Sequence, residues 1–173
     1  MSLETMLFLS IRVLHVLLAG LWVGAVFFIS TLLLPADEQA GPAGGRVMTV
    51  LVRRGLPAVM AALGGTVLVT GFYLFWRFTG GFDPVISGSR PGIAFSIGAL
   101  AGLIALIIGG SVVGRGTKKM AALGEQAAAV PEQQRGAITN DIAAIRARVV
   151  VSIRIVLVLL LIAMATMALG HYI

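Results

Sequence analysis

The sequence predicts an all-α, membrane-embedded protein: an antiparallel four-helix bundle with a cytoplasmic helical hairpin between the third and fourth helices. Of its 173 residues, 58% are hydrophobic and only 12% are charged, whereas roughly a quarter of the residues of a soluble domain are charged. Four apolar stretches are each long enough to cross a bilayer as a helix, which takes about 20 residues. We expect one membrane domain over residues 1–173.

The four predicted spans cover residues of about 7–34, 55–76, 91–114 and 149–171. The connections PADEQAGPAGGR and RFTGGFDPVISGSRP separate the first three spans, and their Pro, Gly, Asp and Ser residues predict turns and loops. The N-terminal MSLETM has no basic residue, and the apolar run behind it is too long for a cleaved signal peptide. We therefore expect the first helix to be retained.

The third connection, residues 115–148, is predicted to be a helical hairpin. Apolar residues recur at helical spacing from Met120 to Val130, and Pro131 ends that run. A helix start at Thr139 leads into the fourth span. This hairpin either binds a cytoplasmic protein partner or only covers the ends of the bundle.

Lysine and arginine are distributed unevenly between the two predicted sides of the membrane. Three lie on one side (Arg12, Arg77 and Arg90), and ten lie on the other (Arg46, Arg53, Arg54, Arg115, Lys118, Lys119, Arg135, Arg146, Arg148 and Arg154). Because cytoplasmic segments carry the excess of positive charge, both termini are expected outside the cytoplasm. The net charge of +6 thus reports topology, and we expect no nucleic-acid partner.

Small residues on the third predicted span indicate close helix packing. Gly98 and Gly102, and then Gly110 and Gly114, are each four residues apart. Such spacings let two helix backbones approach closely inside a bilayer. They fit a compact bundle and a homo-oligomer contact equally well.

A polar layer is predicted near the outer surface. His15 and His171 lie eight or nine residues from the midpoints of their spans, or about 12–13 Å at the helical rise. We expect the same layer to contain Arg12, Tyr73, Trp76, Arg77, Arg90 and Tyr172. Interfacial anchoring is the better explanation for Trp76, Arg77, Arg90 and Tyr172.

On the first span, the spacing of Arg12, His15 and Trp22 places them on one face of the helix. On the fourth span, Met164, Met167 and His171 likewise share one face. Imidazole and thioether groups suit copper, thioether especially copper(I), and they are also axial haem ligands. Methionine at this spacing is otherwise a common filler of irregular cores.

Other chemistries have little support in the sequence. Cysteine is absent, which excludes disulfides and thiolate sites. No acidic residue lies within a predicted span, so no carboxylate is available there as a proton relay. The sequence contains neither a nucleotide-binding glycine loop in its required context nor a zinc-protease motif. Whether the protein is an enzyme stays open.

The pattern LHVLLAGLWVGAVFF, with His15 and Trp22 seven residues apart and Val-Gly-Ala behind them, resembles the first helix of the bacterial copper-resistance D (CopD) family. The segment TGFYLFW is similar to the end of the second helix of those proteins, and the four-span plan fits most of the chain. The first helix is more distantly similar to HemJ-type protoporphyrinogen oxidases, whose histidine is implicated in haem binding. Their following Pro-Arg and His, and their C-terminal Lys-Pro, are missing here.

The resemblance implies a bacterial inner-membrane protein that handles copper or binds haem b in the outer half of the bilayer. It carries over His15 directly, accompanied by Arg12 and Trp22. Three hypotheses result. His15 and His171, with or without Met164 and Met167, bind copper; or His15 is an axial haem ligand opposite His171 or a methionine; or the protein is non-catalytic and acts through its hairpin, and His15 is only hydrogen-bonded between helices.

Overall fold

The computed structural model describes residues 2–170 and 172–173, and over these residues it contains helices and turns but no strand. The elements in chain order are α1 (Leu3–Phe28), the π-helix η1 (Ile29–Leu33), α2 (Leu34–Ala40), α3 (Pro42–Arg53), α4 (Leu56–Phe78), α5 (Pro84–Ser87), α6 (Arg90–Ile108), the π-helix η2 (Gly109–Gly114), α7 (Arg115–Ala129), the 3₁₀-helix η3 (Glu132–Gln134) and α8 (Arg135–Leu169). The predicted all-helical class is confirmed.

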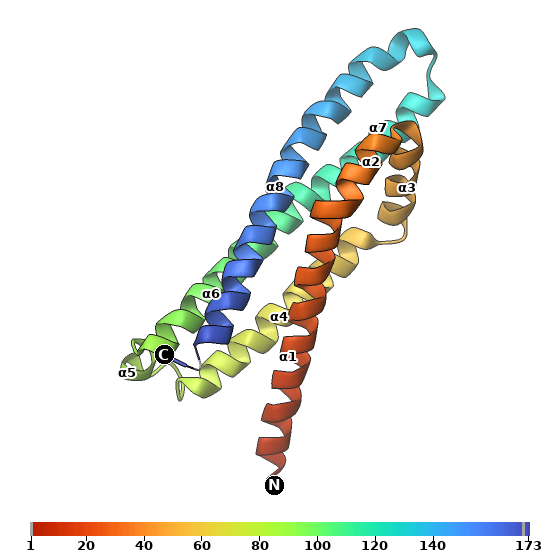
Figure 1. The fold of residues 1–173 in the computed structure, drawn as a ribbon. Coiled ribbons are helices and arrows are strands. Elements are labelled where there is room, and N and C mark those ends of the chain that lie inside the picture. The colour runs from red at the N-terminus through yellow and green to blue at the C-terminus, as the bar shows by residue number, and fades with distance from the viewer. Residues whose placement is uncertain (1, 171) are drawn as a thin grey trace.

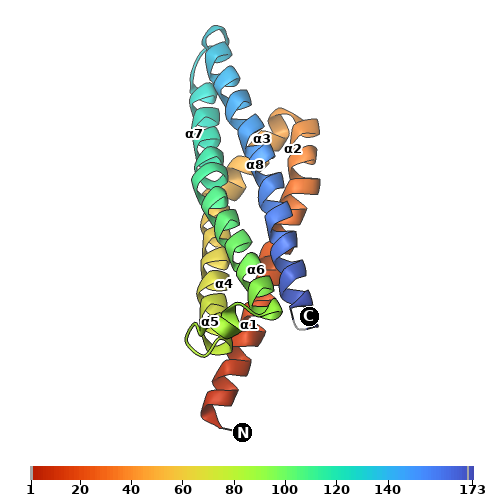
Figure 2. The ribbon, with the colours of Figure 1, turned by 90° about the vertical axis from the view of Figure 1, so that its left-hand side faces the viewer.

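Four continuous helical stretches are long and apolar enough to cross a membrane: Leu3–Ala40, Leu56–Phe78, Arg90–Ala129 and Glu132–Leu169. In the most apolar 18-residue segment of each stretch, only 11% to 33% is buried inside the structure. Figures 1 and 2 show that successive long helices run in opposite directions and that both chain ends lie at the same end of the molecule. Such a large exposed apolar surface is typical of a protein surrounded by lipid.

The first long helix continues where the sequence predicted a loop. It passes through Pro35 and ends at Ala40, and a turn at Gly41 (φ 55°) leads directly into α3. Just before the proline, η1 widens the helix, with the Leu34 N–H bonded to the Ile29 carbonyl five residues earlier. A proline inside a helix lacks a donor and collides with the preceding turn, and a π turn is one way to accommodate it. The predicted loop after residue 34 is therefore wrong.

The helices predicted on either side of Pro131 are present as α7 and α8. α6 continues through η2 into α7, and α8 continues without a break through the fourth predicted span. α8 begins at Arg135, one turn before the predicted start at Thr139. There the Arg135 Nε donates to the Val130 carbonyl at 3.1 Å and ties the start of α8 to the end of α7.

The connection between α4 and α6 is organised by Thr79, which is fully buried. Its hydroxyl donates to the Phe75 carbonyl at 2.9 Å and accepts from the Phe82 N–H at 2.9 Å. Gly80 and Gly81 adopt positive φ angles of 63° and 92°, which glycine tolerates without steric cost. This turn fixes the end of α4 close to the start of α6.

The predicted close packing of the third span is used within the chain. A Cβ atom added to Gly98 would lie 2.8 Å from Thr166 Oγ1 and 3.1 Å from Met167 Cγ, both on α8. Ala105, two turns further along α6, is completely buried. Gly110 has no atom within 4 Å of an added Cβ. Contact through this helix with a second copy of the chain stays a prediction.

Two ion pairs join the helices at the end opposite the termini. Arg146 Nη2 on α8 lies 2.7 Å from Asp37 Oδ2 on α2, and the Asp37 side chain is only 8% exposed. This charge contact lacks hydrogen-bond geometry, and Asp37 Oδ1 has no hydrogen bond to the described residues. The pair Arg53–Glu125, between α3 and α7, is also 2.7 Å long but lies on the surface.

We predict that Asp37→Ala lowers the free energy of unfolding by about 1–3 kcal/mol, because it leaves the partly buried Arg146 without its counter-charge. The exposed pair provides the matched control, since Arg53→Ala should cost less than about 1 kcal/mol. Thermal unfolding in detergent measures both effects. Equal losses for the two variants would contradict this assignment of the buried pair.

Candidate functional site

His15 lies on the side of α1 that packs against α4. Its side chain is 8% exposed, and that of Trp22, two turns further along the same face, is 4% exposed. Their neighbours Leu14, Val16 and Leu21 are exposed large hydrophobic residues. Of the three side chains predicted to share a face of α1, His15 and Trp22 are buried, as is Val26, whereas Arg12 is exposed.

One ring nitrogen of His15 is held by α4. Nδ1 lies 3.1 Å from the Val67 carbonyl oxygen and 3.0 Å from Thr70 Oγ1. The Thr70 hydroxyl donates to the Thr66 carbonyl at 2.7 Å, so its oxygen is free to accept from the ring. Because a carbonyl can only accept, we assign the imidazole proton to Nδ1. The lone pair is then on Nε2, which has no hydrogen bond within the described part of the chain.

Two glycines of α4 make room for the buried rings of α1. A Cβ added to Gly71 would lie 2.9 Å from His15 Cε1, and one added to Gly64 would lie 2.7 Å from Trp22 Cζ2. Only a glycine lets the imidazole and the indole lie this close to the α4 backbone. The contacts fix the relative register of α1 and α4.

The seven-residue spacing of His15 and Trp22 is matched by the seven-residue spacing of Gly71 and Gly64. The later residue on α1 meets the earlier glycine on α4, as two helices running in opposite directions require. Sequence reasoning missed this pairing, although the equal spacings were a visible signal. It also missed Val67 and Thr70, for which no such signal exists.

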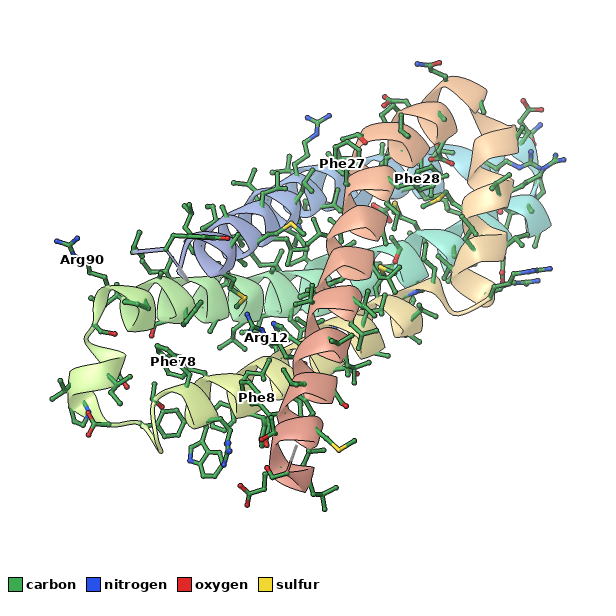
Figure 3. All side chains as sticks on the ribbon, turned by 60° about the horizontal axis from the view of Figure 1, so that its bottom comes forward. Phe8, Arg12, Phe27, Phe28, Phe78 and Arg90 are labelled. Carbon is green, nitrogen blue, oxygen red and sulfur yellow. The ribbon has the colours of Figure 1, made fainter. Side chains whose placement is uncertain are left out.

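The predicted supporting residues have different surroundings. Arg12 is exposed and points from α1 toward the α4–α6 side, whereas Arg90 extends away from the start of α6 (Figure 3). Tyr73 is half-buried on α4 with its ring centroid 6.3 Å from that of Trp76. Arg77 is exposed in the last turn of α4. These positions suit an interfacial layer.

The proposed methionine ligands lie on α8 in unequal environments. Met164 is 47% exposed. Met167 is half-buried and close to Gly98 of α6. His171 lies outside the described residues. The residues that the structure describes contain no group of three His, Cys, Asp or Glu side chains able to hold a metal ion.

Comparison of the chain with models of protein families, with curated proteins and with solved structures finds no match.

We predict that Gly71→Ala and Gly64→Ala each destabilise the protein by about 1–3 kcal/mol, because the new methyl group overpacks against a buried ring. Gly65→Ala is the matched control on the same helix. No atom lies within 4 Å of its added Cβ, so the higher helix propensity of alanine should leave stability unchanged or raise it by up to about 1 kcal/mol.

Thermal unfolding in detergent ranks these three variants. In a Trp76→Phe background, where Trp22 is the remaining tryptophan, Gly64→Ala should also shift the indole emission. An unshifted spectrum together with unchanged stability would show that the indole does not pack on Gly64.

Proposed function

We propose that the chain is a four-helix integral membrane protein of a bacterial plasma membrane, with both termini outside the cytoplasm. Four long apolar helices with mostly exposed apolar faces support the membrane embedding. The alternating helix directions support four crossings (Figure 1). The excess of lysine and arginine at the α3, α7 and α8 end supports the orientation.

We further propose that this protein handles copper, with His15 Nε2 as a ligand in the outer half of the bilayer. The observation that carries this proposal is the hydrogen bond from His15 Nδ1 to the Val67 carbonyl. Metal-bound histidines commonly donate their other ring N–H to a carbonyl or carboxylate, which fixes the tautomer and the ring orientation. Here Nδ1 is occupied in that way and the Nε2 lone pair is available.

Further ligands would come from α8 and from His171, which follows α8 in the sequence. His171 is the natural second imidazole by predicted depth, and Met167 is the better placed thioether because it is half-buried and Met164 is largely exposed. Imidazole and thioether together favour copper over calcium or magnesium, which prefer oxygen ligands. Within α1 and α4, His15 is the only histidine and so the only imidazole ligand for this proposed site.

Haem b binding is the second candidate function, supported by the same free Nε2 and by the first-helix pattern shared with HemJ-type proteins. In an axial haem imidazole, too, the N–H of the other ring nitrogen commonly donates a hydrogen bond to a carbonyl oxygen. Visible absorption distinguishes the two functions, because bound haem gives a Soret band and copper(I) gives none. In a third candidate function, a protein partner binds the α7–α8 hairpin, and the His15–Val67 hydrogen bond serves only to join α1 and α4.

We predict that His15→Ala abolishes bound copper or haem while the protein remains folded in the membrane, because a single buried hydrogen-bonding group contributes only about 1–3 kcal/mol to stability. Metal analysis and visible spectra of protein purified from cells grown with copper and a haem precursor measure the bound group. The matched control is Val26→Ala, which truncates a core side chain on the same helix but leaves His15 in place. Wild-type protein with neither copper nor haem would refute both ligand proposals and favour the third.

For the orientation, we predict that a reporter fused after Ile173 is active outside the cytoplasm and that one inserted near Gln133, in the turn between α7 and α8, is active inside. The positive-charge asymmetry is the physical reason. The opposite result at both positions would place His15 in the inner half of the bilayer.

A further inference from the structure

We propose that the protein binds an anionic glycerophospholipid at a site distinct from His15. A few methylene groups of one acyl chain occupy an apolar cavity between α4 and η2, and the phosphate headgroup is held by Arg54 and Arg115. The proposal rests on the membrane embedding proposed above but not on copper or haem binding.

The cavity has a volume of about 80 Å³ and is lined almost entirely by apolar atoms. Trp22 and Val26 of α1 form part of its wall, Leu56 and Met60 contribute from α4, and Val113 contributes from η2. An apolar cavity gives water no hydrogen-bonding partners and is expected to stay dry. Hydrocarbon is the chemistry that such a lining accepts.

Both π-helical turns contribute to this cavity. Ile29 begins η1, and Gly109, Gly110, Val113 and Gly114 belong to η2. A π turn is rare and occurs often at functional sites. Gly110 is exposed, and an atom added at its Cβ position would meet nothing within 4 Å. The glycine-rich side of η2 therefore leaves space beside α4.

Two arginines lie close in the chain to residues that line one end of the cavity. Pro57 and Gly114 both line it, and a Cβ added to Gly114 would lie 3.9 Å from Pro57 Cβ. Arg54 precedes Pro57 by three residues, and Arg115 directly follows Gly114. Both side chains are exposed. Because arginine side chains are long, guanidinium groups at these two chain positions are suited to bind a headgroup at that end of the cavity.

Arg54 and Arg115 also have no ion pair or hydrogen bond from their side chains to the described residues. Their neighbours differ in this respect, since Arg53 pairs with Glu125 and Arg146 pairs with Asp37. Guanidinium groups bind phosphate well because they can donate two parallel hydrogen bonds. Two available guanidinium groups next to an apolar cavity match the anionic headgroup and the hydrocarbon chain of one lipid. The volume suits a few methylene groups and is too small for a helix of a protein partner.

Native mass spectrometry of the detergent-purified full chain tests this site with two probes of identical acyl chains, phosphatidylglycerol and phosphatidylcholine. Wild-type protein should retain phosphatidylglycerol preferentially. The double variant Arg54→Gln/Arg115→Gln should weaken phosphatidylglycerol binding about 25-fold, since one basic residue near an anionic lipid contributes about fivefold, and leave phosphatidylcholine binding unchanged. Lys119→Gln/Arg148→Gln removes the same charge from exposed positions and should change neither.

The cavity is tested by Gly110→Leu, whose side chain would fill it and should reduce binding of both lipids at least fivefold. Gly24→Leu is the matched control, because Gly24 is exposed on α1 and has no atom within 4 Å of an added Cβ. Equal retention of the two lipids by wild-type protein, or full retention by either test variant, would overturn the proposal. The measurement in detergent depends neither on membrane orientation nor on a group bound at His15, so its failure is separable from theirs.

Discussion

The contact of two aromatic rings of α1 with the backbone of α4 is the constraint on which the rest of the structure depends. His15 lies against Gly71 and Trp22 against Gly64, and the His15–Val67 hydrogen bond adds a directional link between the same helices. Together they set the rotation and the register of α1. The imidazole is held in one orientation as a result, and the indole becomes part of the central core with Val26 and Leu160.

The same packing rule operates between α6 and α8. In the proposed membrane environment, lipid offers helices no hydrophobic gain on association, so close backbone approach and van der Waals contact would stabilise the bundle. α6 buries Ala94, Gly98, Ala101, Gly102 and Ala105, and larger α8 side chains such as Met167 fill the space beside them. Large side chains on one helix thus lie against small ones on its neighbour in both pairs. Where a glycine of η2 has no such partner, the apolar cavity remains.

The two ends of the molecule are held by different interactions. At the end with the termini, Thr79 and a cluster of phenylalanines organise the α4–α6 connection, with Phe78 and Phe95 in an edge-to-face contact at 5.1 Å. At the opposite end, the long helices extend beyond the apolar stretches and are joined by the Asp37–Arg146 and Arg53–Glu125 pairs. Charged contacts suit an aqueous environment, and aromatic side chains suit a membrane interface.

The sequence by itself determined the helical class, the four apolar stretches, the break at Pro131 and the shared face of His15 and Trp22, because hydrophobic length and helical spacing are local properties of the chain. It did not determine that the first helix continues through Pro35, since this depends on the π turn before it and on the Asp37–Arg146 pair with α8. Only the tertiary structure decided that His15 Nδ1 meets Val67 and Thr70, and that Met167 packs on α6 while Met164 is exposed. Those features depend on the rotation and register of one helix against another, which arise from contacts between residues as far apart in sequence as Gly71 and His15.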